Sequence, residues 1–293
     1  MSLIQAIVLG LVQGLTEFLP ISSSAHLVIV PWLLGWETPG LAFDAALHLG
    51  TLAAVLVYFR ADLLGMARAL PRAVADPIGV LRGPRPGPGP GRPDDPDARL
   101  ALLIAIGTIP GGVAGLLVEG TVEGIYHGDG GTADGAIVAI AVALMALALL
   151  LFAAERAARH VRGLASVRLP DAVVVGLAQA LALVPGVSRS GATLTAGLFR
   201  GLRRADAARF SFLLGVPVIA AAGLKGLLDS LQAGFAPGAL PIFVLGIAVS
   251  GLSGFAAIAG LLRYLQRAST MVFVVYRIAL GLLLLLLVVV GFR

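Results

Sequence analysis

Long apolar stretches separated by short polar ones fill most of the chain. Six of them have about 20 residues, which is the length that an α-helix needs to cross ~30 Å of hydrocarbon. They lie at about 41–60, 100–118, 135–153, 207–228, 239–262 and 270–291. The pattern therefore predicts an all-α polytopic membrane protein with six transmembrane helices.

Two further apolar segments are each interrupted by a polar turn. Residues 3–35 are broken at Glu17–His26, and residues 171–200 are broken at Pro185–Ser190. Neither half of either segment is long enough to cross a bilayer. We therefore expect two re-entrant helix-turn-helix pairs, whose irregular backbone is tolerated in a membrane because it lines a cavity.

Composition agrees with this interpretation. Of the 293 residues, 58% are hydrophobic and only 13% are charged, which leaves too little polar surface for a soluble globular protein. The chain has no cysteine, which excludes disulfides and thiolate metal sites. The net charge of +5 comes from arginines without interleaved aromatic residues, so we expect a bilayer as the partner and no nucleic acid.

The basic residues also predict the orientation of the chain. Arginines gather after the first, third and fifth predicted spans and after the second interrupted segment, whereas residues 119–134 carry four acids and no lysine or arginine. Because cytoplasmic loops are enriched in basic residues, the first interrupted segment is expected to enter from the outer side. Residues 83–97, rich in glycine and proline, are expected to form a disordered cytoplasmic insert.

The two interrupted segments resemble each other in sequence. Gly10–Gln13 recurs as Gly176–Gln179, and Ser22–Ala25 recurs as Ser188–Gly191, both 166 residues later. Three predicted spans lie between the copies, and an odd number inverts the orientation. We therefore predict one membrane domain, 1–293, built as an inverted-topology repeat of halves at about 1–153 and 171–293, with the two polar turns facing each other.

The first turn carries groups suited to nucleophilic chemistry. Gln13 and Glu17 are four residues apart and share a helix face, and Ser23 and His26 are three apart on the helix that follows. A serine beside an imidazole is the arrangement needed for attack by an activated hydroxyl, and Glu17 would orient the imidazole or hold a cation. A serine-rich turn alone would more often be a simple helix kink.

The second turn carries groups suited to phosphate. Arg189 offers a planar fork of donors that fits phosphate oxygens, and Gly186 lets the backbone approach a ligand. Hydroxyl donors are available from Ser188, Ser190 and Thr193. An arginine in the middle of an apolar segment needs an anion, and a diphosphate would account for both turns.

Two more groups of polar residues stand out. Asp44 and His48, four residues apart in the first predicted span, are expected to support the site or to form an interfacial contact. Arg277, in the last predicted span, is expected to extend toward the membrane surface or to pair with an acid.

The two turns resemble the signature motifs of a known family, the undecaprenyl-diphosphate phosphatases, also called UppP or BacA. The similar stretches are Gln13–His26 and Pro185–Thr193, together with Phe210–Pro217 and Tyr276–Ile278 near the end. Two long motifs in the same order make the resemblance specific, and it extends over nearly the whole chain.

The resemblance implies hydrolysis of undecaprenyl diphosphate to undecaprenyl phosphate, which recycles the lipid carrier for peptidoglycan synthesis and confers resistance to bacitracin. It implies a multi-pass protein of the bacterial cytoplasmic (inner) membrane with the active site open to the outer side, and another copy of the chain is a candidate partner, as a homodimer. By motif position the catalytic residues are Glu17, Ser23, His26 and Arg189, and the phosphate binders are Ser22, Ser24, Gly186, Ser188, Ser190 and Thr193.

A divalent cation, Mg²⁺ or Ca²⁺, is also implied by the resemblance, with Glu17 and Gln13 as its ligands. Many members of the family carry glutamate where this chain has Gln13, so the cation should bind more weakly here.

The expected mechanism is attack by Ser23, deprotonated by His26, on the terminal phosphorus. Activation of water by His26, or attack by His26 itself, are the alternatives. The rival function is a lipid-phosphate flippase or an anion transporter, because inverted repeats with broken helices are the usual plan of transporters.

Overall fold

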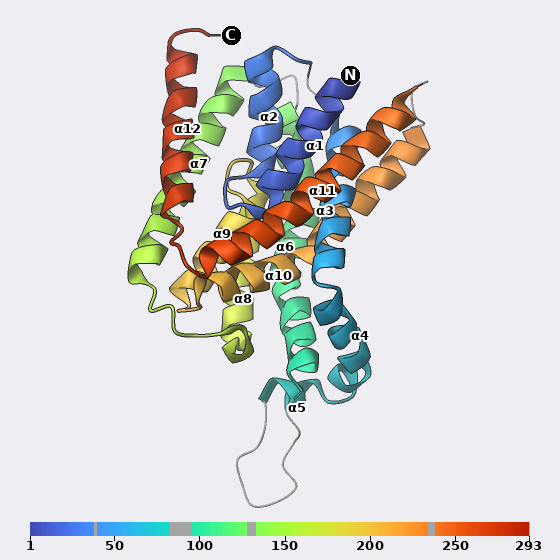
Figure 1. Cartoon of the computed structure of the whole chain (residues 1–293), viewed down its shortest axis with the longest axis vertical. Coiled ribbons are helices and arrows are strands. Elements are labelled where there is room, and N and C mark those ends of the chain that lie inside the picture. Colours follow the sequence, from blue (N-terminus) through green and yellow to red (C-terminus); the bar gives the residue numbers. More distant parts are fainter. Residues whose placement is uncertain (38–39, 83–94, 128–132, 234–237, 293) are drawn as a thin grey trace, which may run out of the picture.

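The computed structural model in Figure 1 describes residues 1–37, 40–82, 95–127, 133–233 and 238–292, and it is a bundle of helices. Five of its helices are long and apolar enough to span a membrane, or six if α3 and α4, bent by 78° at Phe59, count as one span. The five are α6 (Pro96–His127), α7 (Ala133–Ala157), α10 (Arg204–Ala233), α11 (Ala239–Leu265) and α12 (Met271–Val289). Within the described ranges no β-strand forms, and the predicted class, an all-α polytopic membrane protein, is confirmed.

The bend between α3 (Leu41–Tyr58) and α4 (Arg60–Ala75) changes one detail of the prediction. The basic segment after Arg60 is not a plain loop, because it continues as α4 and α5 (Pro77–Arg82). Most of the predicted insert, residues 83–94, lies outside the described residues, and the rest begins α6. There Asp95 caps the helix by accepting a hydrogen bond from the N–H of Ala98 at 3.0 Å.

Both interrupted segments form helix pairs at the predicted places. The first consists of α1 (Leu3–Phe18) and α2 (Ser23–Leu34), and the second of α8 (Leu169–Ala180), the short 3₁₀ turn η2 (Leu181–Leu183) and α9 (Arg189–Phe199). The local sequence explains their ends. Ser2 and Gln5 form a capping box at the start of α1, Pro20 follows its end, and Gly35 in a left-handed conformation closes α2.

The two turns share an unusual backbone geometry. Ser22 and Ser188 are the N-caps of α2 and α9, and their φ values are 78° and 72°, a region that residues other than glycine rarely adopt. Each hydroxyl accepts a hydrogen bond from the N–H three residues later, that of Ala25 at 3.4 Å and that of Gly191 at 3.1 Å. Such local strain is typical of functional sites, and here it occurs at matching positions of the two copies.

Close helix contacts also occur at matching positions. Helix α1 packs against α11, and α8 packs against α6 (Figure 1). A Cβ atom on Gly10 would lie 2.8 Å from the carbonyl oxygen of Gly246, and one on Gly176 would lie 2.3 Å from that of Gly107, so both helix pairs need glycine to approach this closely. In an inverted repeat α1 corresponds to α8 and α6 to α11, so the pair α1 with α11 corresponds to the pair α8 with α6. The repeat itself stays a prediction.

Candidate active site

The two turns meet at an ion pair between Glu17 and Arg189. Glu17 lies in the last turn of α1 and Arg189 is the first residue of α9. Nη2 of Arg189 donates to Oε1 of Glu17 at 3.0 Å, and both side chains are largely shielded from solvent. The predicted encounter of the two turns is therefore present, because residues 172 positions apart in the sequence share one hydrogen bond.

Ser23 lies at the same carboxylate. Its Oγ donates to Oε2 of Glu17 at 2.6 Å, and Nε2 of Gln13 donates to the same oxygen at 3.2 Å. The hydroxyl thus has a carboxylate as its acceptor, at a distance expected for a charge-assisted hydrogen bond. The structure places a potential base for Ser23 in Glu17, which the sequence prediction had assigned to orienting the imidazole or binding a cation.

His26 is not paired with Ser23, and this corrects the predicted serine–imidazole arrangement. Nδ1 of His26 lies 2.6 Å from the carbonyl oxygen of Ser22, and Nε2 lies 2.6 Å from Oη of Tyr276 on α12. Spacing along α2 put the two side chains on neighbouring positions, but the short bonds to Ser22 and Tyr276 turn the ring away. Both ring nitrogens are therefore engaged in holding the turn against α12.

Helix α10 shapes the pocket for the Arg189 guanidinium. Nη1 of Arg189 donates to the carbonyl oxygen of Ser211 at 3.3 Å, and a Cβ atom on Gly215, one helical turn later, would lie 1.8 Å from Nη1. Nε of Arg189 is buried and has no hydrogen-bond partner in the described part of the chain. A buried donor without an acceptor is unfavourable, so the site is suited to an anion that would accept from it.

The other predicted hydroxyls mostly build the turns. Oγ of Ser190 reaches across to the carbonyl oxygen of Leu19 in the first turn at 3.1 Å. Oγ1 of Thr193 contacts Oγ of Ser211 at 2.5 Å, which ties α9 to α10. Ser22 and Ser188 cap their helices, and each lies 3.2 Å from a second hydroxyl, of Ser24 and Ser190 respectively.

Arg277 holds the two turns together, a role that the sequence prediction missed. Its side chain is fully buried, so the expectation that it extends to the surface or pairs with an acid is wrong. Nη1 donates to the carbonyl oxygen of Pro20 in the first turn at 3.0 Å, and Nη2 donates to that of Gly186 in the second at 2.9 Å. The similar stretch around Tyr276 drew attention to this position, but an arginine that binds backbone carbonyls leaves no partner pattern in a sequence.

His48 on α3 is a further neighbour of Glu17. Its Nε2 lies 3.8 Å from Oε2 of Glu17, and its Nδ1 lies 2.8 Å from the backbone carbonyl oxygen of Asp44. His48 thus lies beside the first turn, and its contact with Asp44 is through the backbone of that residue and not through the carboxylate. The Asp44 carboxylate has a buried oxygen, Oδ1, without a hydrogen-bond partner among the described residues.

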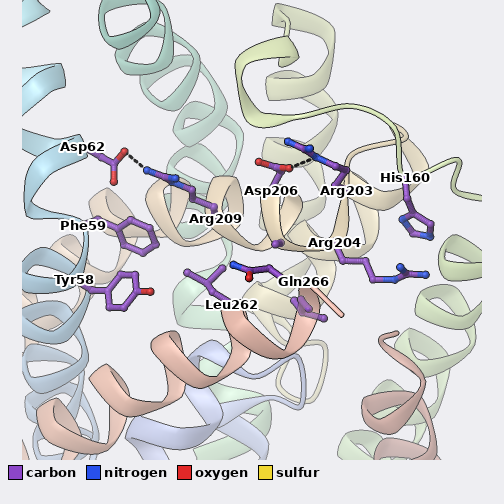
Figure 2. Close-up of a pocket in the computed structure, with 12 residues that line it drawn as sticks. Tyr58, Phe59, Asp62, His160, Arg203, Arg204, Asp206, Arg209, Leu262 and Gln266 are labelled. Carbon is purple, nitrogen blue, oxygen red and sulfur yellow. Dashed lines mark hydrogen bonds and ion pairs between the residues drawn. The ribbon is translucent and has the colours of Figure 1, made fainter. Parts of the chain in front are cut away.

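A cavity of about 790 Å³ lies away from these turns, at the predicted inner end of the bundle (Figure 2). The acids and arginines around it form ion pairs, Arg203 with Asp206 at 2.7 Å and Arg209 with Asp62. The third arginine of the lining, Arg204, pairs with Glu155. Each arginine of the cavity thus has an acidic partner, and the pair of Arg209 with Asp62 joins α10 to α4.

Three aromatic rings in successive contact connect the wall of this cavity to the residue next to Glu17. Phe59 lines the cavity, its ring centroid lies 6.4 Å from that of Phe212, and Phe212 lies 5.3 Å from Phe18, the neighbour of Glu17. All three side chains are buried. No described residue of either polar turn lines the cavity, so the cavity and the turns are distinct in this structure.

Comparison with known proteins gives a consistent result. A sequence model of the family described as "Bacitracin resistance protein BacA" matches residues 6–283. The undecaprenyl-diphosphatase of Thermomicrobium roseum is 50% identical over 289 residues, which cover 98% of this chain and 99% of that protein. The undecaprenyl-diphosphatase of Myxococcus xanthus is 48% identical over 293 residues, 99% of this chain and 91% of that protein.

Proposed function

The chain belongs to the BacA family, and we propose from this membership and from the site that it hydrolyses undecaprenyl diphosphate to undecaprenyl phosphate and inorganic phosphate. The observation that carries the proposal is the contact of Arg189 with Glu17 at 3.0 Å, with Ser23 on the other carboxylate oxygen at 2.6 Å. A hydroxyl, a base and a guanidinium are the groups that phosphoryl transfer requires.

The first step is attack of Ser23 Oγ on the terminal phosphorus. As the new O–P bond forms, the proton of Ser23 passes to Glu17, its acceptor at 2.6 Å. The bond from that phosphorus to the bridging oxygen breaks, and undecaprenyl phosphate leaves. The departing undecaprenyl phosphate takes the proton from Glu17. Water then attacks the phosphoserine and gives a proton to Glu17, which passes it to Ser23 Oγ as the Ser23 O–P bond breaks and inorganic phosphate is released.

Arg189 supplies charge to the transferring group. The buried Nε, which has no acceptor among the described residues, would donate to a phosphate oxygen while Nη2 stays on Glu17. Negative charge accumulates on the equatorial oxygens in the transition state, so donors that are fixed in advance favour it. The contacts with Ser211 and Gly215 fix this guanidinium.

His26 positions the first turn in this scheme. Its Nδ1–H donates to the carbonyl oxygen of Ser22, and Nε2 accepts from the hydroxyl of Tyr276. This holds the strained N-cap from which α2 starts and so sets the direction of the Ser23 hydroxyl. The alternatives in which His26 activates water or attacks phosphorus require it to give up one of these bonds.

A divalent cation fits the donor atoms at Glu17. Oε1 of Gln13 is a fully buried amide oxygen without a hydrogen-bond partner among the described residues, and it lies on the side chain that contacts the carboxylate. Gln13 and Glu17 would hold the ion, and water and substrate oxygens would complete its shell, as is usual for Mg²⁺. Such an ion would neutralise charge on the diphosphate.

The protein is a multi-pass membrane protein, and we place it in the bacterial cytoplasmic membrane with the site open to the outer side. Support comes from the arginine distribution of the sequence. Hydrolysis there would return the carrier lipid for peptidoglycan synthesis and would lower the amount of diphosphate available to bacitracin.

Release of phosphate from undecaprenyl diphosphate by the purified protein in detergent tests the function. We expect hydrolysis by the wild type, loss of at least a hundredfold in Ser23→Ala, and no loss in Ser166→Ala, whose hydroxyl contacts Gly163 at the predicted inner end. Movement of the lipid across liposomes without any hydrolysis would instead support the transporter.

A further inference from the structure

The ring of His48 is fixed in one tautomer by its backbone contact. Nδ1 lies 2.8 Å from the carbonyl oxygen of Asp44, and a carbonyl oxygen can only accept a hydrogen bond. Nδ1 must therefore carry a proton. In the neutral ring the other nitrogen, Nε2, then has a free lone pair, which is the form in which histidine binds metals.

That lone pair is directed at the site. Nε2 lies 3.8 Å from Oε2 of Glu17, which is too far for a hydrogen bond. Two electron-rich atoms at this separation repel each other unless a positive species lies between them. Two ligands bound to one ion at roughly 2.0–2.2 Å each are separated by up to about 4 Å, so the observed distance suits a shared cation.

Gln13 supplies a third atom. Its Nε2 donates to Oε2 of Glu17 at 3.2 Å, so the amide group is beside the carboxylate. Its Oε1 is buried and without a hydrogen-bond partner among the described residues. A half-turn of the amide about its last bond would put Oε1 where Nε2 now lies, next to Glu17.

We propose that His48 Nε2 is a cation ligand together with Glu17 Oε2 and Gln13 Oε1. The role of the ion rests on the proposed function, because the bound ion would act on the diphosphate. Binding of the ion does not depend on catalysis and can be measured without substrate. No three His, Cys, Asp or Glu side chains of the described residues cluster as a metal site, and here the third ligand is an amide. His48 would thus compensate for the carboxylate that Gln13 lacks.

The donor set predicts a preference among cations. One imidazole nitrogen with two oxygens favours Mn²⁺ and later first-row ions over Mg²⁺ and Ca²⁺, which prefer oxygen ligands alone. Removal of the imidazole should therefore weaken binding of Mn²⁺ more than binding of Mg²⁺. If protonated His48 instead forms a simple ion pair with Glu17, its cationic ring repels every metal ion. Removal of the ring should then make both Mn²⁺ and Mg²⁺ bind more tightly.

Electron paramagnetic resonance of Mn²⁺ added to the purified protein without substrate tests the proposal. The wild type should bind one Mn²⁺ with a nitrogen coupling typical of an imidazole ligand. His48→Ala should lose the coupling and bind Mn²⁺ at least tenfold more weakly, with Mg²⁺, measured by competition, affected less. His48→Gln should lose the coupling and keep oxygen-based binding, whereas His160→Ala, remote from Glu17, should match the wild type.

Two results would overturn the proposal. One is a wild-type spectrum without nitrogen coupling, a measurement that needs no variant to fold. The other is Mn²⁺ binding in His48→Ala that is as tight as in the wild type or tighter, and tighter binding would identify the histidine as a charge partner of Glu17. If the wild type binds Mn²⁺ with nitrogen coupling but does not hydrolyse undecaprenyl diphosphate, the proposed function is wrong. The assignment of His48 as a cation ligand would still hold.

Discussion

The guanidinium of Arg189 occupies space that exists only because residue 215 is glycine. A Cβ atom on Gly215 would lie 1.8 Å from Nη1 of Arg189 and 2.5 Å from its Cζ, far inside van der Waals contact. The position of the phosphate-binding side chain on α9 is therefore set by a missing side chain on α10, one helical turn after Ser211, whose carbonyl oxygen accepts from Nη1.

Gly215→Ala should therefore reduce hydrolysis by at least tenfold, because the methyl group displaces the guanidinium from the phosphate. The loss should appear in both kcat and KM for undecaprenyl diphosphate. Gly260→Ala on α11 is the matched control, since nothing lies within 4 Å of a Cβ atom there. The control should keep full activity and gain up to ~1 kcal/mol of helix stability. Full activity in Gly215→Ala would show that the guanidinium position is unimportant.

Arg277→Lys should impair hydrolysis by about two orders of magnitude. One ammonium group cannot replace donors that reach Pro20, Gly186 and Leu144 at 2.9–3.0 Å in separate directions. Each buried carbonyl left without a donor costs about 1–3 kcal/mol, so the melting temperature in detergent should fall as well. Kinetics and thermal unfolding of the same preparation measure both effects. A lysine variant with wild-type values for both would refute the linking role.

Glu17→Gln and Tyr276→Phe should differ strongly in effect. The amide cannot take the proton of Ser23, so kcat should fall by roughly 10²–10⁴-fold. Tyr276→Phe removes one hydrogen bond of 2.6 Å to His26 and leaves Ser23 and Glu17 in contact, so we expect a loss of tenfold or less. Initial rates at saturating substrate compare the two. The opposite order would identify His26 as the base.

Asp171 should make stability depend on pH at the acidic end. Burial alone would raise the pKa of this carboxyl, but hydrogen bonds from Arg162, Arg200 and the N–H of Arg168 hold the pKa below its usual value. The group therefore adds stability that is complete above the pKa of the unfolded chain, about 3.9, and is lost as the pH falls through the folded-state pKa.

Asp171→Asn should accordingly destabilise the protein at pH 7 by about 1.5–3 kcal/mol, the usual contribution of hydrogen bonds to a charged group, because the Arg162 and Arg200 side chains left behind are 26% and 39% exposed and stay partly solvated. The carboxyl joins the start of α8 to the end of α9, so the second helix pair should loosen first. The difference in melting temperature between variant and wild type should shrink below about pH 4. A difference that is constant from pH 7 to pH 3 would exclude this linkage.

Hydrophobic length and polar interruptions were sufficient to predict the apolar helices, although not α4 and α5 in the basic segment after Arg60. Local chemistry predicts the spans and the two broken segments. The matching motifs at Ser22 and Ser188 predict that Glu17 meets Arg189. The structure places these features as expected. These features depend on residues close in the sequence or on two copies of one motif. They are therefore visible without coordinates.

Contacts that depend on a third helix were not predictable in this way. Helical spacing alone suggested that His26 serves Ser23, but Tyr276, 250 residues away, determines the direction of the ring. Arg277 binds carbonyl oxygens that every residue possesses, and Gly215 acts through the side chain it lacks. Neither leaves a chemical pattern that identifies its partner.

A double-mutant cycle between Ser23 and Arg189 tests most directly whether the two turns act as one phosphatase site. Phosphate release from undecaprenyl diphosphate would be measured for the wild type, Ser23→Ala, Arg189→Ala and the double variant. Groups that act on one phosphorus in one step are strongly non-additive. The rate of the double variant should therefore lie within about threefold of the rate of the slower single variant. Losses that multiply fully, or wild-type rates in either single variant, would contradict the shared site.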